Sequence, residues 1–194
     1  MRETKSIIVC GVGGQGSVLA SDIIANALFY SDLDVKKCEI HGMSQRQGSV
    51  VGFVKYGDKV YSPVVGKNEA DFLVSFEKLE SLRYISLLKN SSIAIVSNAK
   101  IQPISVIYGL EKYPENIEEY LKKKTSKLIF IDPDEEIKTF GNPKAINVYM
   151  LGILSNFLTE VKYENWIMAI ENTVKKNFVD INIKAFNSGR EKDL

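Results

Sequence analysis

The sequence predicts an α/β domain of three layers, in which helices cover a mainly parallel, mixed β-sheet of Rossmann-like type. Three observations predict this fold class. A short apolar run leads directly into a glycine-rich loop and a helical pattern, further β-rich runs alternate with helical patterns, and the last third of the chain is helical. The 194 residues contain no linker and no internal repeat, so we expect a single domain over residues 1–194.

The first half of the chain gives the clearest patterns. Residues 6–10 are typical of a buried strand, and residues 35–40 predict a second one. The β-rich residues 49–56 end in the turn signal Gly57-Asp58 and residues 59–62 return, which predicts an inserted β-hairpin. The helix after the glycine loop repeats apolar residues on one face, namely Ala20, Ile23, Ile24, Ala27 and Leu28.

Strands and helices continue to alternate after the hairpin. From Asn142-Pro143 onward the chain is expected to be helical, because Asn can cap a helix and Pro suits its first position. The charge run at residues 122–124 indicates a solvated helix end. The remaining strands are expected at residues 71–76, 92–97 and 127–132, and the remaining helices at residues 77–88 and 115–124.

Composition excludes several classes of function. The chain has 25 Lys and Arg against 24 Asp and Glu, a formal net charge of +1, so no net field attracts nucleic acid. No apolar run has the length of a membrane span or signal peptide, which predicts no membrane association, and two reduced cysteines predict a cytoplasmic location. Cys10 and Cys38 are too few for a four-cysteine cluster and are expected to be reduced core thiols, and the single histidine excludes a multi-histidine metal site.

The glycine-rich loop fits a dinucleotide fingerprint. Gly11, Gly13 and Gly16 match G-x-G-x-x-G, and Gly14 adds a further glycine. A nicotinamide cofactor also requires an acidic residue at the end of the second strand, and Glu39 is in that place. The motif alone therefore leaves a dinucleotide site open.

The loop that follows Glu39 argues for a different site. Residues 39–49 hold His41 and Arg46, and they leave the second strand at the same sheet edge as the glycine loop, where ligands collect in open parallel sheets. His41 and Ser44 do not form a convincing nucleophilic pair, since only Glu39 could orient the imidazole. Arg46 suits a phosphate or a partner carboxylate.

These two loops resemble a known family. GVGGQG at 11–16 and EIHGMSQRQGSVV at 39–51 resemble the γ-type subunits of the 2-oxoacid:ferredoxin oxidoreductases, and especially the small (β) subunit of the indolepyruvate-type enzymes. Residues 147–152 and 187–189 resemble later segments of that family. The family usually has glycine where this chain has Gln47, so a close backbone approach is not expected there.

The resemblance implies a subunit of an enzyme that oxidises a 2-oxoacid with coenzyme A as acyl acceptor and ferredoxin as electron acceptor. It implies that thiamine diphosphate and [4Fe–4S] clusters lie on a larger α subunit. Three alternatives stay open: the γ subunit of a pyruvate, 2-oxoisovalerate or 2-oxoglutarate relative, a free-standing dinucleotide-binding protein, and a purely structural interaction domain.

We expect the two loops to form one ligand-facing or partner-facing site. Backbone N–H groups at the helix start and the side chains of Ser44, Gln45 and Arg46 would suit an anion, such as a coenzyme A phosphate or the approach to a thiamine-bound intermediate. The rival interpretation is that the glycines only allow tight packing. Met43, the loop glycines and the hairpin are the expected partner contacts, with a homodimer through the same surface when the chain is alone. The expected site comprises Gly11, Gly13, Gly14, Gln15, Gly16, Glu39, His41, Gly42, Met43, Ser44, Gln45, Arg46 and Gly48.

Overall fold

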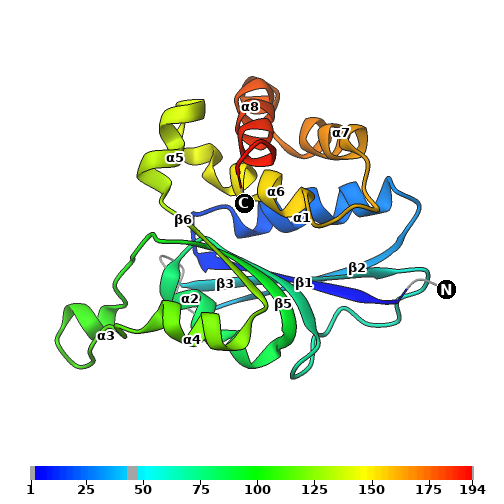
Figure 1. Ribbon diagram of the computed structural model, residues 1–194. Coiled ribbons are helices and arrows are strands. Elements are labelled where there is room, and N and C mark those ends of the chain that lie inside the picture. The colour runs from blue at the N-terminus through cyan, green and yellow to red at the C-terminus, as the bar shows by residue number, and fades with distance from the viewer. Residues whose placement is uncertain (1–2, 43–47, 194) are drawn as a thin grey trace.

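The sheet that organises the molecule has six strands in the order β2-β3-β1-β4-β5-β6 (Figure 1). The computed structural model describes residues 3–42 and 48–193. The strands are β1 (Lys5–Val12), β2 (Asp34–His41), β3 (Ser49–Gly57), β4 (Ala70–Ser75), β5 (Leu88–Ser97) and β6 (Lys127–Ile131). The α-helices are α1 (Ser17–Phe29), α2 (Lys78–Arg83), α3 (Ile104–Ile107), α4 (Ile117–Lys124), α5 (Pro133–Phe140), α6 (Ile146–Ser155), α7 (Tyr163–Thr173) and α8 (Val179–Arg190). Three 3₁₀ turns complete the elements, η1 (Ile85–Leu87), η2 (Pro143–Ala145) and η3 (Lys176–Phe178).

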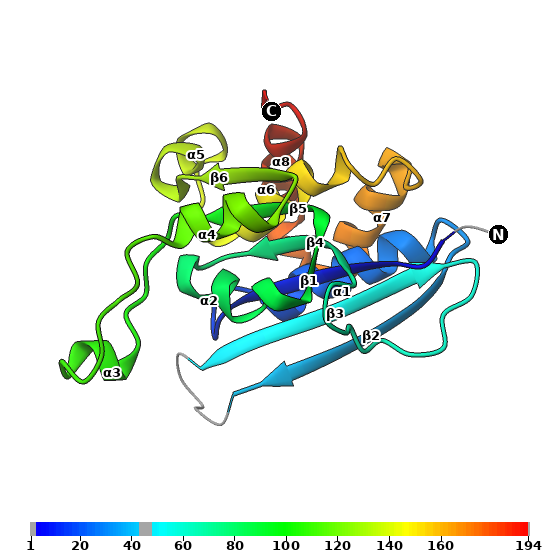
Figure 2. The same ribbon diagram turned by 60° about the horizontal axis from the view of Figure 1, so that its bottom comes forward.

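The three-layer, mainly parallel arrangement predicted from the sequence is confirmed. β1, β4, β5 and β6 pair in parallel, and β3 runs antiparallel to both of its neighbours, β1 and β2. Helices α1 and α6 lie on one face of the sheet with α7 and α8 beyond them, and α2 and α4 lie on the other face (Figures 1 and 2). Within the described residues no helix is both long enough and apolar enough to cross a membrane.

The position of the hairpin was predicted wrongly. β3 pairs with β2, and residues 59–62 form no strand. The reason is that β3 lies between β2 and β1, so both of its edges are already paired. Residues 59–62 are instead attached to β2 by the side chain of Asp34, which accepts the Val60 N–H at 2.8 Å.

The helical C-terminal third is confirmed, and one further helix precedes it. Asp132-Pro133, at the end of the strand predicted over residues 127–132, begins α5: Asp132 accepts the Asp134 N–H at 3.0 Å, and Pro133 is at the first helical position. Asn142 caps η2 in the same way through the Lys144 N–H at 2.9 Å. The helix predicted at residues 77–88 divides into α2 and η1, and β5 begins at Leu88, four residues before its predicted start.

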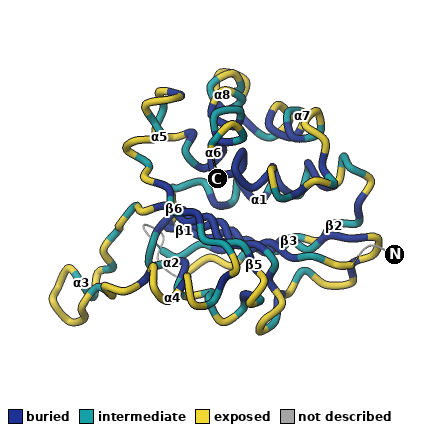
Figure 3. Tube along the Cα trace, in the orientation of Figure 1, coloured by how far each residue is buried: buried dark blue, intermediate teal, exposed yellow. Residues whose placement is uncertain are grey.

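The core consists of two apolar layers, one on each face of the sheet (Figure 3). The predicted face of α1 is fully buried in the larger layer. In α6, residues 147–155 are all buried, since the helix lies between the sheet and α8. Gly152 of α6 and Gly189 of α8 allow the two backbones to touch, because a Cβ on Gly152 would lie 2.1 Å from the Phe186 carbonyl oxygen. The C-terminal helices are therefore part of the core.

The two cysteines differ in accessibility, and this predicts their reactivity. Cys10 is fully buried with its Sγ 3.3 Å from the Ser75 hydroxyl, so the prediction of a core thiol is confirmed for it, whereas Cys38 is half-buried. Burial raises the pKa of both thiols, and the nearby Glu39 carboxylate raises that of Cys38 further. At neutral pH we expect a thiol-specific disulfide reagent to leave Cys10 unlabelled in the native chain and to label both cysteines in denaturant. Rapid labelling of Cys10 in the native chain would contradict this packing.

Candidate functional site at the carboxyl edge of the sheet

The structure brings the two loops together at the carboxyl edge of β1. Val50 of β3 lies opposite both Gly11 of β1 and His41 of β2, so the ends of all three strands meet there. The Gly13 N–H donates to the Gly48 carbonyl oxygen at 2.8 Å, which joins the glycine loop to the end of the second loop. The Gly42 N–H donates to the Ser49 carbonyl oxygen at 2.8 Å. The predicted neighbourhood of the two loops is therefore present.

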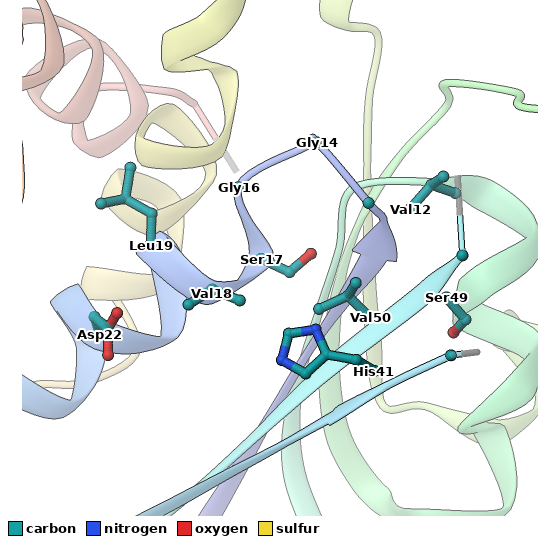
Figure 4. Close-up of a pocket in the computed structure, with 13 residues that line it drawn as sticks. Val12, Gly14, Gly16, Ser17, Val18, Leu19, Asp22, His41, Ser49 and Val50 are labelled. Carbon is teal, nitrogen blue, oxygen red and sulfur yellow. The ribbon is translucent and has the colours of Figure 1, made fainter. Parts of the chain in front are cut away.

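An open groove of about 730 Å³ lies between the two loops and the start of α1 (Figure 4). Side chains of α1 and the end of β2 face it. Met43, Ser44, Gln45, Arg46 and the departure at Gln47 lie outside the described residues, so their part in the site stays a prediction. The groove is lined by residues 12–14, 16–19, 22, 41, 42 and 48–50.

Two of the four loop glycines are required by packing. A Cβ on Gly11 would lie 2.9 Å from both the Gln15 Oε1 and the Ser17 Oγ. A Cβ on Gly16 would lie 2.3 Å from the Nδ2 of Asn147, a buried residue of α6, and Gly16 also has a φ of +83°. Packing within the chain therefore accounts for the glycine at these two positions, and whether they also face a ligand stays a prediction.

Gly14 is different. Its φ of +99° favours glycine, but a Cβ there would meet nothing within 4 Å. Gly14 is exposed and lines the groove, so its lack of a side chain leaves the backbone open to a ligand or partner. Packing within the described residues does not explain why this position lacks a Cβ.

Gln15 is a structural residue of the loop. Its Oε1 accepts the Val12 N–H at 2.7 Å and its Nε2 donates to the Phe76 carbonyl oxygen at 2.9 Å. These bonds fix the loop against the end of β4. Both polar atoms of the Gln15 amide are therefore hydrogen-bonded within the chain. The expectation that Gln15 faces a ligand does not hold for its side chain.

The start of α1 presents uncompensated donors to the groove. Within the described residues no side chain caps Gly16, and the first turn of α1 holds no acidic residue, whereas α4, α5, α7 and α8 each begin with at least one. The first intrahelical hydrogen bond of α1 runs from the Ala20 N–H to the Gly16 carbonyl oxygen at 2.9 Å. The N–H groups of Ser17, Val18 and Leu19 come before it and have no backbone acceptor among the residues that the structure describes. The Ser17 Oγ is also buried without a hydrogen-bond partner in the described part of the chain. This helix start therefore carries partial positive charge suited to an anion.

The other wall of the groove holds a charged network. Lys37 pairs with Asp22 of α1 and with Glu39, and the His41 Nε2 lies 3.2 Å from the Glu39 Oε2. Burial opposes ionisation of Glu39, but Lys37 and His41 outweigh it and lower the pKa of Glu39. The Glu39 carboxylate is thus ionised and already paired, which argues against its binding a free ribose. His41 remains more than half exposed beside the groove.

Several residues of the site were not predicted from the sequence. Ser17, Val18, Leu19 and Asp22 belong to the first turns of α1, and their place after the glycine loop was the available signal. Lys37 reaches the network because neighbouring side chains of β2 point to opposite faces of the sheet. Lys37 is on the face that α1 covers, and Cys38 is on the other face. Within the described residues no group of three or more His, Cys, Asp or Glu side chains is arranged to hold a metal ion.

Comparison with known proteins agrees with this architecture. The sequence matches the family described as pyruvate ferredoxin/flavodoxin oxidoreductase over residues 6–192. The indolepyruvate oxidoreductase subunit IorB of Archaeoglobus fulgidus is 38% identical over 187 residues, which are 95% of this chain and 92% of that protein.

Two solved structures share the fold. The γ subunit of a keto/oxoacid ferredoxin oxidoreductase from Geobacter sulfurreducens superposes with a TM-score of 0.72 at 22% identity, covering 98% of this chain and 96% of that one. The 2-oxoglutarate:ferredoxin oxidoreductase of Magnetococcus marinus, solved with 2-oxoglutarate, coenzyme A and succinyl-CoA bound, gives 0.74 at 17% identity, covering 98% of this chain and 31% of that one. With a family match over nearly the whole sequence, the chain belongs to the pyruvate ferredoxin/flavodoxin oxidoreductase family.

Proposed function

We propose that the chain is the small subunit of an indolepyruvate (arylpyruvate)-type 2-oxoacid:ferredoxin oxidoreductase. In the proposed reaction the 2-oxoacid loses its carboxylate as carbon dioxide, the thiol of coenzyme A takes the acyl group, and two electrons pass to ferredoxin. The observation that carries this proposal is the 38% identity with the Archaeoglobus subunit across almost the full length of both chains. A cytoplasmic location is part of the proposal.

The redox and thiamine chemistry is assigned to another chain. A [4Fe–4S] cluster needs four thiolates, whereas this chain has two cysteines, and Cys10 of β1 is fully buried in the core, which raises its pKa. These residues do not fit a cluster. We therefore place the clusters and thiamine diphosphate on a larger α subunit, so that this chain contributes to the reaction only as part of a complex.

The groove is the part of this chain that we assign to coenzyme A. The uncompensated start of α1 and the open backbone at Gly14 are both suited to oxygen atoms of a phosphate. Asp22 of α1 also lines the groove but is paired with Lys37. The helix start therefore gives the groove its attraction for an anion.

The larger subunit is proposed to cover the same edge of the sheet. The Magnetococcus comparison supports only the presence of a larger neighbour, since there the matched fold is 31% of one long chain. In this protein the corresponding neighbour would be a separate polypeptide. It would meet the groove, residues 42–48 and the end of the β2–β3 hairpin.

The proposal is tested by anaerobic reconstitution. We expect this chain to be inactive alone and, when co-expressed with the larger subunit, to support ferredoxin reduction that requires both indolepyruvate and coenzyme A. Parallel assays with pyruvate, 2-oxoisovalerate and 2-oxoglutarate define the substrate class. A complex that is inactive with all four 2-oxoacids would refute the proposal. Tight binding of NAD by the isolated chain would also refute it and would favour a dinucleotide-binding protein.

A further inference from the structure

An arm projects from the body of the molecule at the carboxyl edge of the sheet. It comprises residues 98–116, between β5 and α4, and none of these residues is buried (Figures 1 and 2). Its tip carries four large apolar side chains, Ile104, Ile107, Tyr108 and Leu110, with exposed fractions of 61%, 61%, 76% and 78%. Four such side chains gathered on one short projection indicate a surface that another molecule covers.

The tip is ordered by its own hydrogen bonds. The Ile107 N–H donates to the Pro103 carbonyl oxygen at 3.0 Å, and the Leu110 N–H donates to the Ser105 carbonyl oxygen at 2.8 Å. The Ser105 hydroxyl donates to the Glu111 carboxylate at 2.9 Å. Because the backbone is satisfied within the tip, its apolar side chains face outward from a defined turn. A partner would therefore meet a preformed surface.

The base of the arm is fixed by a buried carboxylate. Glu77, which is 1% exposed and caps α2, accepts the Ile101 N–H and the Tyr113 hydroxyl, each at 3.0 Å. Ile101 lies on the outgoing limb and Tyr113 on the returning limb, so one side chain holds both. Lys100 stacks over the Tyr113 ring with its Nζ 4.3 Å from the ring centre.

The charge around the base selects the kind of partner. A hollow of about 610 Å³ under the arm is lined by Lys78, Lys100 and Lys112 and by a single acidic residue, Glu115. Within the described residues none of these three lysines has a carboxylate within salt-bridge distance. The hollow therefore carries unpaired positive charge, with which the acidic side chains of a partner would pair.

The arm is continuous with the candidate site. A smaller hollow of about 230 Å³ is lined by Val12, Gly48 and Ser49 from the site and by Pro103 and Ile104 from the arm. A protein that covers the groove would therefore reach the arm as well. We propose that the apolar tip of the arm inserts into an apolar pocket with an acidic rim on the larger subunit. This inference rests on the proposed function, which supplies that subunit.

The test compares two matched double variants of the full chain, with affinity for the larger subunit measured anaerobically. Tyr108→Ser with Leu110→Ser removes two side chains of the tip. Phe29→Ser with Val64→Ser removes two side chains of similar exposure, both 65%, outside the arm. We expect the arm variant to bind at least 30-fold more weakly and the control less than threefold more weakly, with melting temperatures of the isolated chains unchanged.

Charge reversal gives a second readout. Lys112→Glu is expected to slow association about tenfold at low salt, with the difference shrinking as salt is added. If the arm variant binds like the wild type in an active complex, the inference is wrong and the proposed function stands. If the wild-type chains form no complex, the proposed function fails and the inference with it. A wild-type homodimer that the arm variant abolishes would identify a second copy as the occupant and overturn the inference.

Discussion

Gly152→Ala in α6 is expected to lower the melting temperature of the isolated chain by about 10 °C. The added Cβ would lie 2.1 Å from the Phe186 carbonyl oxygen and 3.0 Å from both the Arg190 nitrogen and the Gly189 Cα, all of which are backbone atoms of α8. Backbone cannot rotate away as a side chain does, so α8 must shift as a unit within a buried interface. Overpacking of this kind costs about 3 kcal/mol, and each kcal/mol moves the midpoint of a chain this size by about 2–4 °C.

The reciprocal substitution and an exposed control make the result specific. Gly189→Ala should have a similar effect, since its Cβ would lie 2.0 Å from the Tyr149 carbonyl oxygen. Lys184→Ala replaces an exposed residue of the same helix and should change the midpoint by less than about 2 °C, as surface substitutions usually do. Thermal unfolding followed by circular dichroism measures all three. A Gly152→Ala variant as stable as the Lys184→Ala variant would contradict the close contact of α6 and α8.

Val18→Glu is expected to raise the KM for coenzyme A in the reconstituted complex about tenfold without destabilising the chain. Val18 is half-buried, lies in the first turn of α1 and lines the groove, and that turn has no acidic residue. A carboxylate there should interact favourably with the helix dipole, so stability is preserved or slightly raised. The same charge would repel a phosphate at the helix start, and a tenfold loss corresponds to about 1.4 kcal/mol.

Val18→Gln is the matched control, because glutamine has nearly the same shape as glutamate but carries no charge. It should leave the KM for coenzyme A within about twofold to threefold of the wild type, and neither variant should alter the KM for ferredoxin. If the Glu and Gln variants have the same KM for coenzyme A, the groove does not bind an anion. The glycine loop would then serve packing alone.

The parts of the fold that depend on local sequence were predicted correctly. The apolar face of α1 follows from a spacing of three and four residues, and all five predicted positions are fully buried. The partner of β3 was not predictable in this way, because pairing depends on which strand edge is free in the assembled sheet. The sequence signal at Gly57-Asp58 correctly ends β3, but both edges of β3 are already paired with β1 and β2, so the following segment does not pair with it.

The site shows the same division between local and distant causes. The meeting of the two loops at one edge follows from the direction of β1 and β2, which the strand–helix order implied. The role of Gly16 depends on Asn147, 131 residues away, and no local pattern reveals that contact. Gln15 is a polar residue of the predicted binding loop, yet the two hydrogen bonds of its side chain are made within the chain. Side-chain roles inside the loop therefore required the structure.

Hydrogen exchange of the reconstituted complex, with and without coenzyme A, tests the central claim most directly. The N–H groups of Ser17, Val18 and Leu19 lack a helical acceptor, whereas the Ala20 N–H is already bonded to the Gly16 carbonyl oxygen. Binding of a coenzyme A phosphate at the helix start predicts added protection of residues 17–19, with little change at the end of α1. Exchange at residues 17–19 that stays the same under saturating coenzyme A, while the complex turns over, would contradict the assignment of this groove to coenzyme A.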